Sequence, residues 1–213
     1  MTNDRLAMDF TIAIREPVMK HLSKAVFLFA ITILVSACQT KPVIETNYVF
    51  DSTAQQELAI NARQFEIIDN WQMPIASPYV EHELSPTPSQ KLIEWATDNL
   101  RPLGGSGELI LNISEASVQL EKLPPAEGLL NSLKDNQETR IRVTLAAQLL
   151  WIQPVGNQQG RAELAAKTTQ TLPESSTPKD YDIAIQNNLN KAIALIDEQA
   201  REKIMEIEGI ILP

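Results

Sequence analysis

Apolar and polar residues alternate most regularly along residues 140–152, RIRVTLAAQLLWI. A period of two residues is typical of a strand with one buried face and one solvated face. The stretch PVGNQQG at residues 154–160 then predicts a hairpin loop into a further strand over residues 161–172. The apolar positions of the first strand are Ile141, Val143, Leu145, Ala147, Leu149 and Trp151.

Another strand is predicted over residues 107–123, but its apolar positions change parity halfway along. Leu109, Leu111 and Ile113 have odd numbers, whereas Ala116, Val118 and Leu120 have even numbers. One extra residue in a strand has this effect, so the sequence predicts a β-bulge across Ser114 and Glu115.

The part of the chain before this strand predicts a strand, a loop and a helix. Residues 59–71 follow a rough strand pattern, and a surface loop with four prolines between positions 74 and 88 comes next. Thr87, Pro88 and Gln90 then have the pattern of a capping box with proline at the first helical position. This helix is expected to end near Pro102 and Gly104.

A long amphipathic helix is predicted at the C-terminal end. It begins at a second cap, Thr177 with Pro178 and Asp180, and Gly209 is expected to stop it. Its apolar residues recur at spacings of three and four. They are Ile185, Leu189, Ala192, Ile196, Ala200 and Ile204.

The predicted order is therefore strand, helix, three strands, helix. Half-polar strands are typical of an antiparallel sheet with one solvated face. The fold class expected is α+β: a single antiparallel sheet of about four strands with two helices on one face. This domain would comprise residues 59–213.

Residues 19–37 have the features of a secretory signal peptide. MKHLSK contributes two lysines and no acid, and residues 25–35, AVFLFAITILV, are apolar apart from Thr32. Eleven helical residues rise about 16 Å, roughly half of the hydrocarbon core, so a leader is favoured over a spanning helix. Residues 1–37 are the expected leader. Three acids in the first eighteen residues suggest that translation starts at Met19, with a long n-region as the alternative.

The only cysteine, Cys38, directly follows Val35, Ser36 and Ala37. This arrangement resembles the lipobox of bacterial lipoproteins. The resemblance implies cleavage between Ala37 and Cys38, a thioether-linked diacylglycerol on Cys38, and an N-acyl chain on the new amino terminus. Nothing downstream supplies a disulfide partner, and more than one acyl chain gives stable membrane attachment. A buried core cysteine is the alternative.

The residues after Cys38 predict where the protein is anchored and how far it reaches. Gln39 stands where lipoproteins kept in the inner membrane of many Gram-negative bacteria have Asp, so the resemblance implies the periplasmic face of the outer membrane. Residues 38–58 are the expected lipidated N-terminus and tether, because residues 41–58 show no sustained period. Fully extended, residues 41–58 would reach roughly 60 Å at about 3.3–3.6 Å per residue.

The charge distribution of the chain argues against nucleic acid as a partner. The whole chain has 18 basic and 27 acidic residues, and residues 38–213 have a net charge of about −10 with scattered lysines and arginines. A nucleic-acid backbone is bound by clustered cations, so nucleic acid is an unsuitable partner. An acidic body is also not attracted to an anionic bilayer, so the lipid has to supply the anchoring.

Candidate catalytic and metal-binding residues are few. His82 is the only histidine after Cys38 and lies between Glu81 and Glu83. A zinc site needs three or four ligands, and neither a second histidine nor a free thiol accompanies His82. We therefore expect no metal, no cofactor and no enzymatic activity, with Glu81, His82 and Asp98 as the residues of an alternative envelope-acting hydrolase.

Aromatic residues and two arginines are the candidates for a binding surface. Trp71, Tyr79 and Trp95 are candidates to line a groove, although tryptophans in strands and helices are mostly core residues. Arg140 and Arg142 share the polar face of the most regular strand, where a solvated sheet face is the alternative to a partner contact.

Residues 64–118 resemble a group of uncharacterised proteobacterial lipoproteins. In that group a strand ending in Asp and an aromatic leads through a Pro-Tyr and Glu-His segment into a helix with Trp-Ala-x-Asp-x-Leu. The element order is also similar to the auxiliary lipoproteins of ABC-type envelope transport systems and to the lipoprotein that plugs the lipopolysaccharide-assembly barrel. The matching residues are Asp69, Trp71, Pro78, Tyr79, Glu81, His82, Trp95, Ala96, Asp98 and Leu100.

These observations predict a lipid-anchored periplasmic binding or assembly module that acts beside an envelope transport machine. Cys38 supplies the anchor and the α+β body supplies the contact surface. A structural lipoprotein that associates with its own copies is a further alternative to the hydrolase.

The lipidation of Cys38 is directly testable. Cys38→Ala and Cys38→Ser remove the thiol needed for the thioether, so both variants should leave the membrane fraction, whereas the wild type should stay in it. Cell fractionation and intact-mass spectrometry of the purified protein measure this. A wild-type protein without lipid mass, or a serine variant that stays on the membrane, would contradict the prediction.

Overall fold

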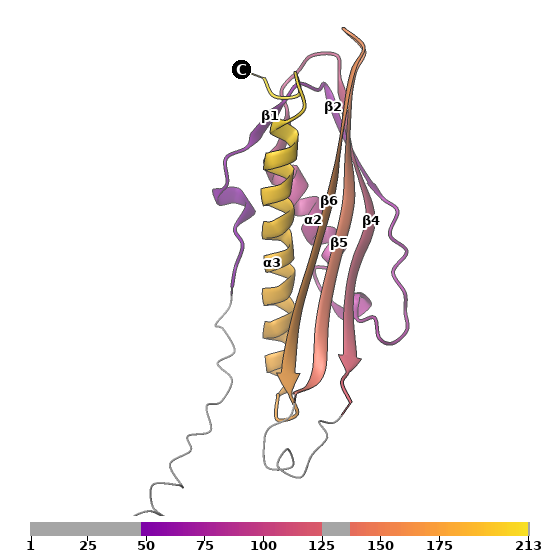
Figure 1. Ribbon diagram of the computed structural model, residues 1–213, viewed down its shortest axis with the longest axis vertical. Coiled ribbons are helices and arrows are strands. Elements are labelled where there is room, and N and C mark those ends of the chain that lie inside the picture. The colour runs from indigo at the N-terminus through magenta and orange to yellow at the C-terminus, as the bar shows by residue number, and fades with distance from the viewer. Residues whose placement is uncertain (1–47, 125–136, 213) are drawn as a thin grey trace, which may run out of the picture. The chain divides into compact units, whose positions relative to one another are not determined.

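The computed structural model of the protein describes residues 48–124 and 137–212. Its main element is an open sheet with the strand order β2-β4-β5-β6 (Figure 1). These strands are β2 (Gln64–Asp69), β4 (Glu108–Lys122), β5 (Gln137–Gln153) and β6 (Gln158–Pro173).

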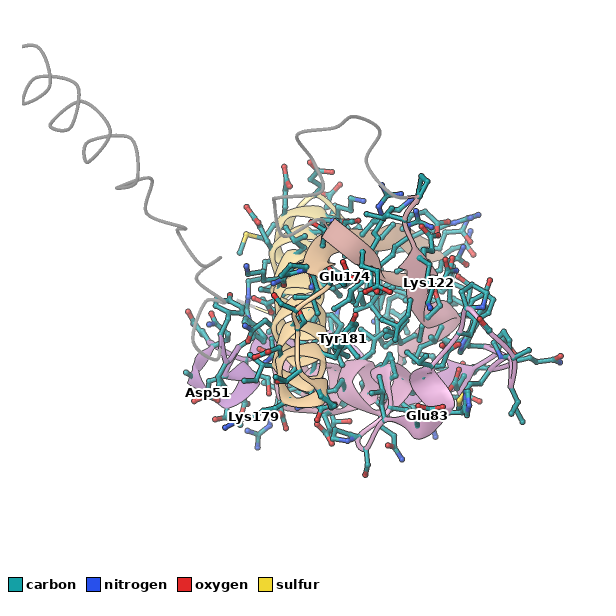
Figure 2. All side chains as sticks on the ribbon, turned by 90° about the horizontal axis from the view of Figure 1, so that it is seen from below. Asp51, Glu83, Lys122, Glu174, Lys179 and Tyr181 are labelled. Atoms are coloured by element: carbon teal, nitrogen blue, oxygen red, sulfur yellow. The ribbon has the colours of Figure 1, made fainter. Side chains whose placement is uncertain are left out.

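Two helices cover one face of this sheet. They are α2 (Pro88–Asn99) and α3 (Pro178–Met205), and Figure 2 shows side chains filling the space between both helices and the strands. Both predicted capping boxes are confirmed: the Thr87 side chain accepts from the Gln90 amide, and the Thr177 side chain from the Asp180 amide. The α+β fold with its order of strands and helices is therefore confirmed.

Strands β4, β5 and β6 form an antiparallel meander whose core face follows the predicted alternation. All six apolar positions predicted for β5 are buried, as are Leu109, Leu111 and Val118 of β4. The predicted bulge is confirmed as a shift in the β4–β5 register between Ile113 and Glu115. It moves the apolar residues from odd to even positions while the same face of β4 stays buried.

The expectation of a single antiparallel sheet is corrected in two respects. Strand β2 pairs with β4 in parallel, with Gln64 opposite Glu108 and Asp69 opposite Ile113. The connection through α2 returns the chain to the end of the sheet where β2 began, and such a crossover produces parallel strands. A second, two-stranded parallel sheet joins β1 (Leu58–Ile60) to β3 (Leu100–Pro102).

Both helices end earlier than their stop signals predict. Helix α2 ends at Asn99, because Leu100–Pro102 pair with β1 as β3. Helix α3 ends at Met205, four residues before Gly209, which has a φ of 82° and accepts a hydrogen bond from Asn61 Nδ2 at 3.0 Å. The left-handed conformation turns the last residues towards β1, where Ile211 forms a bridge with Ile60.

The described part of the predicted tether is attached to the body. The Tyr48 amide donates to Asn187 Oδ1 at 2.8 Å, and Asn190 Nδ2 donates to the Tyr48 carbonyl at 2.7 Å. A 3-10 turn, η1 (Ser52–Ala54), follows, and Ser52 Oγ donates to Asp98 Oδ2 at 2.6 Å. Residues 48–57 therefore cannot act as a free tether in this conformation.

A buried polar network joins α2, α3 and the segment before β1. Asp197 is 6% exposed, and its carboxylate accepts from Trp95 Nε1 at 3.0 Å and from Arg201 Nε at 2.8 Å. Arg201 also donates to Asn99 Oδ1 and to the Gln56 carbonyl, each at 2.7 Å. One carboxylate and one guanidinium thus satisfy groups from three segments that are far apart in the sequence.

Removing the Asp197 carboxylate should destabilise the fold strongly. Asp197→Ala leaves the Arg201 guanidinium and the buried Trp95 N–H without their partner, and breaking a buried ion pair in this way costs about 3–5 kcal/mol. Urea unfolding followed by circular dichroism measures the change. Asp182→Ala, on an exposed position of the same helix, is the matched control and should change the unfolding free energy by no more than about 0.5 kcal/mol. Equal effects of the two variants would contradict this role of Asp197.

Candidate binding surface

The helices pack on one face of the main sheet and leave its other face, here called the outer face, to the polar positions of β4 and β5. Gln119 of β4 stands opposite Arg142 of β5, and Glu121 stands opposite Arg140. On β6, Thr169 and Thr171 continue the same two rows. The period-two pattern therefore places Arg140 and Arg142 together on this face, as predicted from their parity.

Tyr79 joins this face through backbone pairing of the proline-rich segment. The Val80 amide donates to the Val118 carbonyl at 3.0 Å, and the Leu120 amide donates to the Pro78 carbonyl at 2.8 Å. These bonds make Tyr79 the antiparallel bridge partner of Gln119, so its side chain lies on the outer face. Tyr79, Gln119 and Arg142 thus form one row across three neighbouring segments.

Both arginines share one carboxylate. Arg142 binds Glu121 through two nitrogens, with Nη2 3.0 Å from Oε2, and its Nη1 also donates to Gln119 Oε1 at 3.2 Å. Arg140 Nη1 lies 3.5 Å from Glu121 Oε2. Two cations therefore contact one anion. Lys167, opposite Thr144 on the adjacent row, adds a third cation, and Glu115, opposite Ala146, adds a second anion. This part of the outer face is therefore locally basic, although the chain as a whole is acidic.

The far half of the outer face has a different electrostatic character. Glu163 accepts hydrogen bonds from Arg161 Nε and from Gln148 Nε2, each at 2.7 Å. The hydrogen bond from Arg161, and then that from Gln148, lowers the pKa of Glu163 below its usual value. The carboxylate is thus charged at neutral pH and balances Arg161, so this half is not locally basic.

The two tryptophans of the predicted surface do not lie with Tyr79 and the arginines. Trp95 is 1% exposed and binds Asp197 from inside the core, which removes it from any binding surface. Trp71 is partly buried and packs against the core, and its indole N–H is buried without a hydrogen-bond partner among the described residues. The surface retained from the prediction comprises Tyr79, Arg140 and Arg142.

Glu81, His82 and Asp98 are not brought together. Glu81 and His82 lie in the 3-10 turn η2 (Glu81–Glu83), shortly before α2 begins, whereas Asp98 lies in the last turn of α2. Twelve helical residues span about 18 Å, so the three side chains belong to opposite ends of the helix. Glu81 has a structural contact instead: it is 1% exposed, and its Oε2 accepts from the Val118 amide at 3.2 Å.

His82 and the other potential ligands form no cluster in the described ranges. His82 Nε2 lies 3.6 Å from Glu83 Oε1 at the surface. No group of three histidine, cysteine, aspartate or glutamate side chains suited to a metal ion occurs in residues 48–124 and 137–212. No helix in those same ranges has the length and apolar character needed to cross a membrane. Ala37 and Cys38 lie outside the described residues.

The sequence gives no local signal for the role of Pro78–Val80. The four prolines between positions 74 and 88 predict a surface loop, yet Pro78–Val80 extend the edge of β4 beyond the end of β2. Val80 and Leu84, both apolar and both packed against the core, are the only hint that the loop is not wholly solvated. Gln119, which positions Arg142 beside Tyr79, is likewise visible as a site residue only once the strands are paired.

Comparison with known proteins identifies lipoproteins among distant structural neighbours. No protein-family model matches the chain, and no curated protein matches its sequence. The chain is similar to rare lipoprotein B from Shewanella oneidensis, with 9% identity and a TM-score of 0.39 over 69% of this chain and 100% of that chain. It is also similar to a minor lipoprotein from Acinetobacter baumannii, with 11% identity and a TM-score of 0.35 over 73% and 99%.

A third structure is a Xanthomonas campestris protein of the DUF330 family, with 8% identity and a TM-score of 0.32 over 76% of this chain and 95% of that chain.

The structural role of Glu81 can be separated from a catalytic one. Glu81→Ala leaves the buried Val118 amide without an acceptor and opens a void, so unfolding should become easier by about 1–3 kcal/mol. His82→Ala, next to it at the surface, is the matched control and should stay within about 0.5 kcal/mol of wild type. Urea unfolding measures both variants. A Glu81→Ala effect no larger than that of His82→Ala would contradict the structural role.

Proposed function

We propose that the protein is a lipid-anchored envelope module that binds a protein of a transport or assembly machine and performs no catalysis of its own. The observation that carries this proposal is the row of Tyr79, Gln119 and Arg142 on the outer face of the sheet. An aromatic residue beside arginines is a composition enriched at protein interfaces.

The charge distribution supports an acidic or polar partner surface. The mature chain is acidic overall, so its general field repels acidic proteins and disfavours nonspecific contact with them. Arg140, Arg142 and Lys167 locally outnumber Glu115 and Glu121 on the outer face. A partner with carboxylates at matching positions would be recognised through charge-assisted hydrogen bonds from the planar arginine side chains.

The anchor limits where this partner is found. If Cys38 bears the lipid, ten residue steps connect it to Tyr48, which is attached to α3. Ten residues span at most about 36 Å, so the first attached residue lies within that distance of the lipidated cysteine. A partner for the outer face must therefore lie in or close to the membrane that holds the anchor, which we propose is the periplasmic side of the outer membrane.

Arg140→Glu tests the outer face with Arg161→Glu as its matched control. The tagged full chain is purified from gently solubilised membranes, and bound proteins are quantified by mass spectrometry. Arg140→Glu should lower recovery of an envelope transport or assembly component at least about tenfold, the equivalent of 1.4 kcal/mol. Arg161→Glu, on the far half of the same face, should retain it.

Two further measurements complete the test. Thermal unfolding of both variants must match the wild type, and Cys38→Ala should lose the partner through loss of membrane attachment. Recovery of the same component with Arg140→Glu would refute the role of the outer face. Recovery of nothing except the lipoprotein itself would refute the proposed function.

A further inference from the structure

Strand β2 has a free backbone edge in the described structure. It pairs with β4 on one side only, and no described strand pairs with its other side. The Asn70 amide donates to the Ile113 carbonyl at 3.0 Å, which continues the ladder between β2 and β4. In a strand, alternate residues bond to the same neighbour. Phe65, Ile67 and Asp69 therefore direct their N–H and C=O groups to the free edge.

The other edges of the sheet are closed by specific contacts. On β6, Gln199 accepts from the Ala165 amide at 3.1 Å and donates to the Ala165 carbonyl at 2.8 Å, as a neighbouring strand would. Lys203 binds the Glu163 carbonyl on the same edge. The half of β4 beyond β2 is closed by Pro78–Val80. Proteins block exposed edges in such ways to prevent unwanted pairing, whereas β2 has only the exposed charges of Glu66 and Asp69 on its edge strand.

A cavity of about 490 Å³ lies beside this edge. Phe65 and Ile67 stand opposite Leu109 and Leu111 of the buried face, so their side chains lie on the helix side of the sheet. The volume of the cavity falls within the range of ligand pockets, about 300–1,000 Å³. The lining includes Phe65, Thr97, Asp98, Leu100, Pro102 and Glu57.

An added strand would contact both the free edge of β2 and the adjacent cavity. Its backbone would pair with the free groups of β2, and every second side chain would point to the helix side of the sheet, towards the cavity. This is the geometry of peptide recognition by strand addition, in which main-chain bonds give affinity and pockets for alternate side chains give specificity.

The charges around the edge favour a basic occupant. Glu57 and Asp98 line the cavity, and Glu66 and Asp69 are exposed on β2. Arg101 is already paired with Glu57 at 2.7 Å, and that hydrogen bond raises the pKa of Arg101. Arg63, just before β2, is the other nearby cation. Four carboxylates and two guanidinium groups therefore lie around this edge.

We propose that the β2 edge and its adjacent cavity bind an extended segment of a partner protein in which apolar and basic residues alternate. The segment adds to the main sheet as a fifth strand and places apolar side chains against Phe65 and Leu100. This site is separate from the outer face and does not depend on the proposed function.

The test uses the full lipidated chain in detergent and two synthetic peptides of equal length, one alternating lysine with valine and one alternating glutamate with valine. Isothermal titration calorimetry measures their affinities. The basic peptide should bind at least tenfold more tightly than the acidic one. Glu66→Gln removes an exposed charge from the face of β2 on which the lysines of the peptide would lie, so it should weaken binding of the basic peptide several-fold.

Substitutions at Ile67 test the backbone pairing. Ile67→Pro removes an outward N–H without removing a bond to β4, so it should abolish peptide binding and leave thermal unfolding close to that of the wild type. Ile67→Val retains the N–H and a β-branched side chain and should bind as the wild type does. If Ile67→Pro unfolds the protein, protection of the Ile67 amide from hydrogen exchange on peptide binding replaces it as the readout.

Three outcomes would overturn the proposal: neither peptide binds, binding survives Ile67→Pro in a folded protein, or the Ile67 amide gains no protection. Binding by a shortened chain that starts at Tyr48, but not by the full chain, would also overturn it and would identify the protein's own N-terminal residues as the occupant. A concentration-dependent mass that Ile67→Pro abolishes would assign the edge to a second copy instead.

Discussion

The buried carboxylate of Asp197 is the contact on which the arrangement of this fold depends. A buried charge is unfavourable unless it is paired and fully hydrogen-bonded, and Asp197 meets that requirement only where Trp95 and Arg201 meet. Arg201 in turn reaches Asn99 and the Gln56 carbonyl. The polar network thus joins α3 to α2 in one placement, and it attaches the residues before β1 at the same place.

That placement determines the two faces of the sheet. With α2 and α3 held on one side, the six apolar residues of β5 are covered, and the polar residues between them are left on the outer face. Arg140 and Arg142 both bind Glu121, and Gln119 accepts a hydrogen bond from Arg142 in the row that contains Tyr79. The basic character of this face is thus a consequence of strand register, since a shift of one residue would bury both arginines.

Sequence reasoning succeeded where the determining contacts are local. The capping boxes at Thr87 and Thr177 involve residues three apart, and the bulge of β4 is visible as a change of parity. The parallel pairing of β2 with β4, the pairing of β1 with β3 and the bridge of Tyr79 all join distant segments whose own patterns do not specify a neighbour. Trp95 was misplaced for the same reason, because the acceptor for its indole N–H lies 102 residues away. Of the candidate site, the arginines follow from period two, whereas Tyr79 and Gln119 required the fold.

The treatment of the strand edges shows which part of the sheet is adapted for further pairing. Holding a glutamine or lysine side chain in one conformation costs up to about 2 kcal/mol of rotamer entropy, and the β6 edge holds both Gln199 and Lys203. The segment that covers the half of β4 beyond β2 begins at Pro78, which has no backbone N–H. Strand β2 has instead an unpaired edge, half-buried aromatic and aliphatic side chains and a cavity next to them. A free edge next to apolar side chains is open to pairing with another strand, so an occupant of β2 would cover the one edge of the described main sheet that no other segment or side chain binds.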